Sequence, residues 1–98
     1  MSKVLNSEEF KKEVLESKEY VYVDFYADWC GPCRMLSPIM DEIENDHKVY
    51  KVNVDEEEEL AQEYGVMSIP CVILFKDGKE VTRSIGLKSK DEILNMIK

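Results

Sequence analysis

The motif Trp29-Cys30-Gly31-Pro32-Cys33 constrains this chain more than any other stretch. A run of mainly β-branched and aromatic residues, 20–27, precedes the motif and predicts a strand. A run with helical spacing, 34–45, follows it and predicts a helix. Cys30 therefore falls at a strand-to-helix turn, with Cys33 one turn inside the helix. Side chains at this spacing have Cβ atoms about 5–6 Å apart, and small main-chain adjustments bring them to the roughly 3.8 Å of a disulfide.

This position also favours a reactive thiolate on Cys30. The free N–H groups and the positive end of the dipole at a helix N-terminus stabilise the negative sulfur, which is the nucleophilic form. We expect Cys30 to face solvent and attack, and Cys33 to be more buried and resolve. Pro32 fits because a first-turn N–H has no helical partner to lose. Gly31 leaves the outer side of the turn open to another chain.

Two other interpretations of the cysteine pair stay open on the residues alone. A Cys-x-x-Cys pair is also half of a zinc site. Cys71 and His47 are the remaining ligand candidates, although the sequence has no second closely spaced ligand pair. A purely structural disulfide is the other alternative, but a loop this short would stabilise the fold little through loop entropy.

Size and charge narrow the possible classes of function. The 98 residues are predicted to form a single domain, 1–98, whose core needs no disulfide staples. The net charge of −8 argues against nucleic acid and membrane surfaces as partners, because phosphate contacts use Lys and Arg. The sequence shows no secretory signal and no apolar run near 18 residues. We therefore expect a cytoplasmic protein, where structural disulfides are rare, and nothing in the sequence requires more than a monomer.

Local signals place the other elements. Strands are predicted at 4–5, 48–55, 71–76 and 80–85, and helices from residue 6 or 7, at 33–44, at 55–65 and at 89–98. Asn6 and Ser89 each have a glutamate three residues later, which predicts a capping box at both positions. Asp77-Gly78 predicts a hairpin. Pro38 falls inside a helix and is expected to kink it.

The segment Asp24-Phe25-Tyr26-Ala27-Asp28-Trp29-Cys30-Gly31-Pro32-Cys33 resembles the active-site segment of the thioredoxin family, and the likeness extends over nearly the whole chain. The predicted order of elements, βαβαβαββα, matches that family. The resemblance implies an α/β fold with a central mixed sheet flanked by helices on both faces. It also implies a thiol–disulfide oxidoreductase that acts as a general protein disulfide reductase through a reversible Cys30–Cys33 disulfide. No cofactor would bind the chain itself. The expected partners are target proteins with reducible disulfides and a thioredoxin reductase that draws electrons from NADPH or another donor.

Asp24 and Lys51 are the other two predicted catalytic residues. Asp24 lies in the predicted central strand, where a carboxylate is costly unless it is paired, hydrated or protonated. The pattern alone leaves an exposed or structurally paired carboxyl equally open. The resemblance implies a buried acid behind Cys33, with its pKa raised by burial to suit a proton acceptor near neutral pH. Lys51 matches the lysine beside that acid in the family and would oppose the shift. The alternative is a solvent-facing lysine.

The resemblance also implies a substrate-docking surface. The Ile69–Pro70 peptide is expected to be cis, in a loop that lies against the cysteines and hydrogen-bonds an extended target. An apolar patch around Cys30 is expected to mark the interaction site, framed by Trp29, Gly31, Pro32, Ile69, Pro70 and Gly86. Trp29 could instead belong to the core.

Three positions depart from the family pattern. Tyr26 stands where tryptophan is common, Ser68 where glycine is common, and Cys71 where threonine is common. We expect Cys71 to be buried and inert, with a side thiol open to glutathione or partner disulfides as the alternative. The alternative functions are a disulfide oxidase or isomerase and a redox-independent binding subunit. The Gly-Pro pair between the cysteines argues against an oxidase, an isomerase and a glutaredoxin, whose motifs usually carry other residues there.

Overall fold

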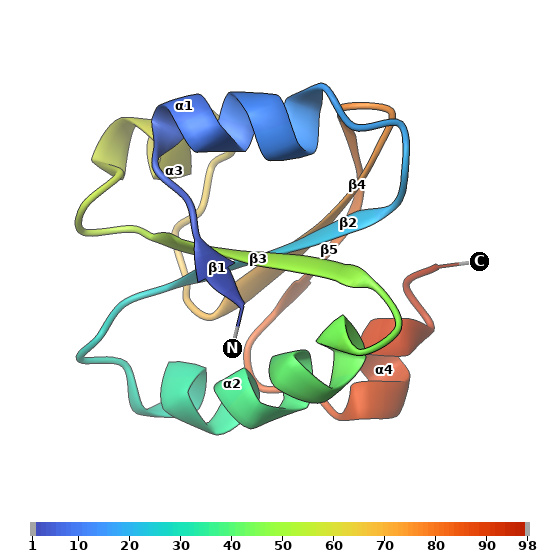
Figure 1. Cartoon of the computed structure of the whole chain (residues 1–98). Helices are drawn as coiled ribbons and strands as arrows, with labels where there is room; N and C mark the ends of the chain where they lie inside the picture. Colours follow the sequence, from blue (N-terminus) through green and yellow to red (C-terminus); the bar gives the residue numbers. More distant parts are fainter. Residues whose placement is uncertain (1, 98) are drawn as a thin grey trace.

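The computed structural model describes residues 2–97 and contains a five-stranded mixed sheet with helices on both faces (Figure 1). The elements follow the predicted order. They are β1 Lys3–Val4, α1 Ser7–Phe10, the π-helix η1 Lys11–Leu15, β2 Val21–Tyr26, α2 Gly31–Glu44, β3 Lys48–Asn53, α3 Glu58–Glu63, β4 Cys71–Lys76, β5 Lys79–Ile85 and α4 Lys90–Leu94.

The sheet has the strand order β1-β3-β2-β4-β5. β3 runs parallel to β1 and β2, whereas β4 is antiparallel to β2 and β5 is antiparallel to β4. β2 is central and almost wholly buried, as its apolar sequence predicts. The register pairs Asp24 of β2 with Lys51 of β3 and with Val72 of β4. A register shift between Leu74 and Phe75 interrupts the pairing of β4 with β5.

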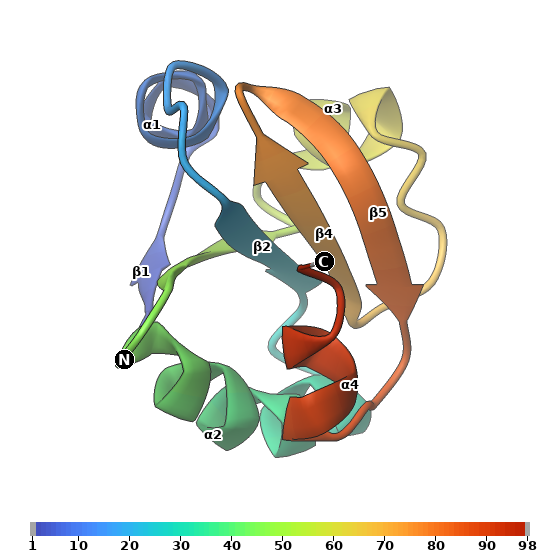
Figure 2. The same cartoon turned by 90° about the vertical axis from the view of Figure 1, so that its right-hand side faces the viewer.

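Two helical layers enclose this sheet. α1 and α3 cover one face, and α2 and α4 cover the other (Figure 2). Successive side chains of a strand point to opposite faces, so Val23 packs in the core under α1 and α3, while Tyr22 packs in the core under α2 and α4. The Tyr22 hydroxyl donates a hydrogen bond to the Ile93 carbonyl at 2.8 Å, which ties α4 to the sheet. Asp24 has the same parity as Tyr22 and therefore faces α2.

The predicted local signals are present. Asn6 and Ser89 each begin a helix with a complete capping box. Asp77 and Gly78 have φ values of 54° and 74°, the left-handed pair that a two-residue hairpin requires. Pro38 lies inside α2, as predicted. None of the helices within residues 2–97 is long and apolar enough to span a membrane.

Two helix boundaries differ from the prediction. α3 begins at Glu58 rather than at Asp55, because the Asn53 side chain holds a turn. Its Oδ1 accepts hydrogen bonds from the N–H groups of Asp55 and Glu56 at 2.9 and 3.3 Å. α4 ends at Leu94, and the predicted end of this helix at residue 98 lies outside the described residues.

Candidate active site

The two cysteines lie at the start of α2, as predicted. Cys30 is the N-cap of the helix, and a disulfide joins it to Cys33 with the Cα atoms 5.2 Å apart. The N–H of Cys33 points to the Cys30 sulfur at 3.2 Å. The first turn therefore supplies Cys30 with a hydrogen-bond donor that would stabilise a thiolate in the reduced protein.

The exposure of Cys30 differs from the prediction. Cys30 is only 4% exposed and Cys33 is 3% exposed, so the expectation of a solvent-facing Cys30 sulfur is wrong. The physical reason is a tertiary contact. Ile69 packs against the small cluster that both cysteines form with Ala27, and its carbonyl oxygen lies 3.9 Å from the Cys30 sulfur. A loop from 39 residues further along the chain thus covers the disulfide.

The covering loop has the predicted cis peptide bond between Ile69 and Pro70. The carbonyl of Pro70 accepts a hydrogen bond from the N–H of Gly86 at 2.8 Å, which joins the loop to the residue after β5. Gly86 has a φ of 92°, which favours glycine. Pro70 is buried, so within the predicted docking patch its ring shapes the loop and offers little exposed surface of its own.

Exposed apolar side chains surround the disulfide turn. Trp29 is 70% exposed, so the alternative that it belongs to the core is wrong. Its indole N–H donates a hydrogen bond to Asp55 at 2.9 Å, which fixes the ring at the edge of the site. Pro32 is exposed and Gly31 is partly exposed. Met67, in the same loop as the cis-proline, is 95% exposed and was not predicted to belong to the docking surface.

Asp24 is completely buried in the central strand β2, opposite Lys51 of β3. Its exposed fraction is 0%, and neither carboxylate oxygen has a hydrogen-bond partner among the described residues. Desolvation raises the pKa of Asp24 to about 6, and the positive charge of Lys51 opposes that rise. The predicted burial of this acid and the predicted direction of its pKa shift are both confirmed.

Lys51 is half-buried and reaches the same region from β3. Its Nζ donates a hydrogen bond to the Ser37 hydroxyl at 3.2 Å and lies 4.4 Å from the centre of the Tyr26 ring. The alternative of a solvent-facing lysine is therefore wrong. Ser37 was not among the site residues predicted from the sequence. The available signal was its position four residues after Cys33, which places it on the same face of α2.

A small pocket opens beside Cys33. It has a volume of about 160 Å³, enough for a few water molecules. We call it the Cys33 pocket, and its lining residues are Tyr26, Ala27, Asp28, Cys33, Arg34, Ser37 and Lys51. Water in this pocket can therefore reach both Cys33 and Lys51.

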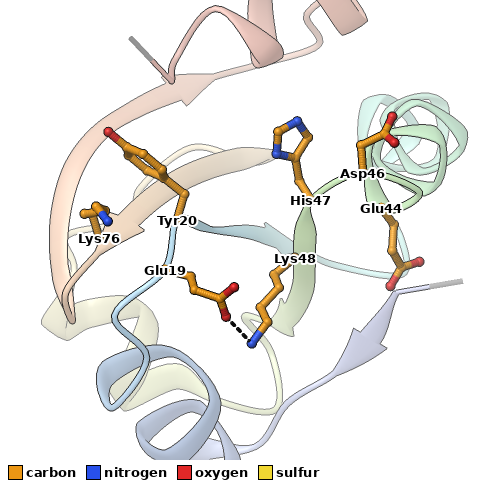
Figure 3. Close-up of a pocket in the computed structure, with 7 residues that line it drawn as sticks. All are labelled: Glu19, Tyr20, Glu44, Asp46, His47, Lys48 and Lys76. Carbon is orange, nitrogen blue, oxygen red and sulfur yellow. Dashed lines mark ion pairs between the residues drawn. The ribbon is translucent and has the colours of Figure 1, made fainter.

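Cys71 and His47 lie apart from the disulfide. Cys71 is buried in the core under α1 and α3, on the sheet face opposite Asp24, and burial raises the pKa of its thiol. His47 packs against Tyr22, with the ring centres 5.9 Å apart, at the other end of the sheet (Figure 3). Within residues 2–97 no group of three or more His, Cys, Asp or Glu side chains could hold a metal ion. The fold thus does not assemble the considered zinc ligand set.

Comparisons with known proteins agree with this geometry. The thioredoxin family model matches residues 1–98. Thioredoxin from Rickettsia felis is 48% identical, covering 99% of this chain and 96% of that protein. Thioredoxin 1 from Synechococcus elongatus is also 48% identical, covering 90% of this chain and 86% of that protein. The solved structure of a mutant thioredoxin from Halobacterium salinarum superposes with a TM-score of 0.90 at 36% identity, covering 98% of this chain and 87% of that one.

These similarities extend over the sheet, the cis-proline loop and the disulfide turn, so they concern the chemistry as well as the fold. They support the reductase function predicted from the motif, and nothing in them favours an oxidase, an isomerase or a redox-independent subunit. The protein is a thiol–disulfide oxidoreductase of the protein disulfide reductase kind, and the chain belongs to the thioredoxin family.

Proposed function

We propose that Cys30 and Cys33 reduce target disulfides in two exchange steps. In the reduced protein the Cys30 thiolate attacks one sulfur of the target disulfide, forms a mixed disulfide and releases the other target sulfur as a thiolate. Cys33 then loses its proton and attacks the Cys30 sulfur, which releases the second target thiolate. Two electrons move to the target, and the Cys30–Cys33 disulfide remains. The observation that carries this assignment is the Cys33 N–H directed at the Cys30 sulfur at 3.2 Å.

Asp24 is proposed to accept the proton of Cys33 through water. Its burial without a hydrogen-bond partner among the described residues and its pKa of about 6 support this role, because a base must be ionised near neutral pH and still hold a proton briefly. Lys51 is proposed to tune this acid. Its charge favours the ionised form of Asp24 and so opposes the effect of burial.

The target is proposed to dock as an extended segment over the loop that covers Cys30. The exposed Trp29 and the carbonyl of Ile69, 3.9 Å from the sulfur, support this path. Main-chain hydrogen bonds at such a loop recognise a backbone with little regard to its side chains, which suits a general reductase. The proposed docking residues are Trp29, Gly31, Pro32, Ile69, Pro70 and Gly86.

The wider role is part of the same proposal. Residues 1–98 are proposed to work as one domain and as a monomer in the cytoplasm, carrying electrons to target proteins and maintaining the redox balance of the cell. A thioredoxin reductase, docking on the same apolar surface as the targets, is proposed to restore the dithiol with electrons from NADPH. No cofactor is proposed to bind this chain, and neither nucleic acid nor a membrane is proposed as a partner.

The first test is a redox titration of the Cys30–Cys33 pair. The protein is equilibrated in a series of dithiol/disulfide buffers, and the oxidised fraction is read by alkylation and intact mass. A reductase requires a strongly reducing midpoint, close to the value of about −270 mV that is typical of this family. A midpoint of about −180 mV, in the range of isomerases, would overturn the proposed direction of electron flow.

A second test separates the roles of the two cysteines. Cys33→Ser protein is mixed with a disulfide-containing target, and the trapped complex is digested and mapped. The expected link joins the target to Cys30. A link to Cys71, or no trapped complex, would contradict the proposed order of attack.

A further inference from the structure

The ammonium group of Lys51 is held in place by two side chains that the reductase mechanism does not use. The Ser37 hydroxyl accepts a hydrogen bond from Nζ at 3.2 Å, and the Tyr26 ring lies 4.4 Å from the same nitrogen. Both contacts lie at the Cys33 pocket, which Tyr26, Ser37 and Lys51 all line. A hydroxyl acceptor on one side and an aromatic face on another give the cation a defined position.

The strand register would favour a different position for the Lys51 ammonium group, next to the carboxyl group of Asp24. Lys51 and Asp24 are direct neighbours on adjacent parallel strands, about 4.8 Å apart at the backbone, and both point toward α2. A lysine stem is long enough to bring its ammonium group to the neighbouring carboxylate. Yet both oxygens of Asp24 lack a hydrogen-bond partner among residues 2–97, so no such pair is formed. Something must hold the ammonium away from the acid.

We propose that Ser37 and Tyr26 are positioning residues that hold the Lys51 ammonium at the Cys33 pocket and so keep it from pairing directly with Asp24. As a consequence, the lysine charge acts on Asp24 only from a distance, and Asp24 retains a high proton affinity. Without the Ser37 hydroxyl, the two unpartnered oxygens of Asp24 become the acceptors available to Lys51. A direct pair then forms and stabilises the ionised carboxylate.

Other charged and titratable groups surround this cluster and must be considered in any pH experiment. Asp28 and Arg34 line the Cys33 pocket from the turn before α2 and from α2 itself. Glu56 acts on Tyr26 from the segment after β3. Cys71, on β4, interacts electrostatically with Asp24 across the sheet. Cys33 carries no charge in the disulfide form, so the oxidised protein is the simpler state to titrate.

The test is a carbon-13 NMR titration of the Asp24 carboxyl group in the oxidised protein, with the signal assigned by its loss in Asp24→Asn. Ser37→Ala is expected to raise the acid dissociation constant of Asp24 about tenfold, because an opposite charge moves into direct contact. Alanine is a strong helix former, so this variant keeps α2. Ser37→Thr retains a hydroxyl and is expected to restore the parent constant. Tyr26→Leu is expected to act in the same direction as Ser37→Ala, with a smaller change.

A double-mutant cycle shows whether Ser37 acts through the lysine. Lys51→Met is expected to lower the dissociation constant of Asp24, because the cation that favours its ionised form is removed. In that background Ser37→Ala is expected to have no further effect. Lys76→Met is the matched control. Lys76 also lies over a tyrosine ring, 5.0 Å from the centre of Tyr20, and donates to the Lys18 carbonyl, but it is at the other end of the sheet.

Two results would overturn the inference: an unchanged or smaller dissociation constant in Ser37→Ala, or an equal effect of Ser37→Ala with and without Lys51. Any effect of Ser37 and Tyr26 on the rate of disulfide exchange rests on the proposed role of Asp24 as proton acceptor. Their effect on the titration of Asp24 does not depend on that role. If Ser37→Ala shifts the titration and Asp24→Asn leaves disulfide exchange unaffected, the proposed proton acceptor is wrong and the positioning cluster stands.

Discussion

The two ends of the central sheet carry pockets with similar side chains and different chemistry. At the end where β2 enters α2, the Cys33 pocket measures about 160 Å³. At the opposite end, where β2 and β3 begin, a pocket of about 510 Å³ is lined by Glu19, Tyr20, Glu44, Asp46, His47, Lys48 and Lys76 (Figure 3). We call the second one the His47 pocket. Each pocket contains a lysine against a tyrosine ring and at least one acidic residue.

The two pockets differ in how deeply their acidic groups are buried. In the His47 pocket the charges face solvent, and Glu19 pairs with Lys48 at 2.7 Å while both side chains remain about half exposed or more. Beside the Cys33 pocket a carboxyl group is fully buried, with no hydrogen-bond partner among the described residues, so its proton affinity changes. Neither pocket size nor the kind of residues in a pocket therefore identifies the reactive end of the sheet. The cost of charging a buried group does.

The largest difference between the two ends should appear in disulfide reduction. Cys30→Ser removes the nucleophile and is expected to lower reduction of a disulfide-bonded test protein by on the order of a thousandfold. His47→Ala changes the other pocket and is expected to leave the rate unchanged. The measurement is the steady-state rate with a dithiol as electron source. A substantial loss of rate in His47→Ala would show that the His47 pocket also contributes to disulfide reduction.

The next difference concerns stability and pH. Folding raises the pKa of Asp24 from 3.8 to about 6, so the folded state binds this proton more tightly than the unfolded state. The associated stability is fully present below about pH 4 and is lost as the pH rises through about 6, a loss of about 3 kcal/mol. Asp24→Asn removes this loss and is expected to stabilise the oxidised protein at pH 8.

The experiment compares urea unfolding of the parent and Asp24→Asn at pH 4 and pH 8. Glu19→Gln, which alters the exposed and paired carboxylate of the other pocket, is the control and should change stability by less than about 1 kcal/mol. An Asp24→Asn protein whose stability follows pH in the same way as the parent would show that this carboxyl is not the buried group responsible.

A kinetic difference should accompany the thermodynamic one. Release of a thiol bound to Cys30 is expected to accelerate as the pH passes about 6, because Asp24 must be ionised to accept the Cys33 proton. Asp24→Asn is expected to slow this step by about a hundredfold at pH 7. Rapid-quench mass spectrometry of the mixed disulfide measures the rate. Retention of the parent pH profile in Asp24→Asn would contradict the proposed base.

The smallest effect is expected at the exposed ion pair. Lys48→Met breaks the contact with Glu19, but both side chains are solvated, so the change in stability should be small and should shrink further in salt. Thermal unfolding at low and high ionic strength measures it. A loss of several kcal/mol would mean that the His47 pocket is energetically important and that burial is a poor guide.

Features that depend on neighbouring residues could be predicted from the sequence. The capping boxes at Asn6 and Ser89 and the hairpin at Asp77 each involve side chains within a few positions, and all three are present. The placement of Cys30 at the helix start follows from the strand before it and the helix after it. Burial of Asp24 was expected only from the resemblance to the thioredoxin family, because the apolar pattern of the strand left an exposed or paired carboxyl equally open, and the structure confirms it.

Features made by residues far apart in the sequence could not be predicted from local patterns. The family resemblance placed the Ile69 loop against the cysteines, but no periodicity relates Ile69 to Cys30, and the near-complete burial of Cys30 under that loop was not predicted. The anchor of Lys51 is a serine on another element, and its hydrogen bond depends on how closely α2 packs on β3. The late start of α3 is a local feature that was nevertheless missed, because the side chain of Asn53 competes with the helix for the N–H groups of Asp55 and Glu56.

The two outer strands of the sheet bear on how the protein behaves when it is concentrated. β1 has only 2 residues, and β5 carries Lys79, Glu80 and Arg83 next to the register shift in its pairing with β4. Short strands, charged side chains and bulges all discourage edge-to-edge association between copies of a protein. The proposed apolar docking patch is thus combined with sheet edges whose short length or charged side chains disfavour pairing between copies, so contacts with targets need not lead to edge-to-edge association.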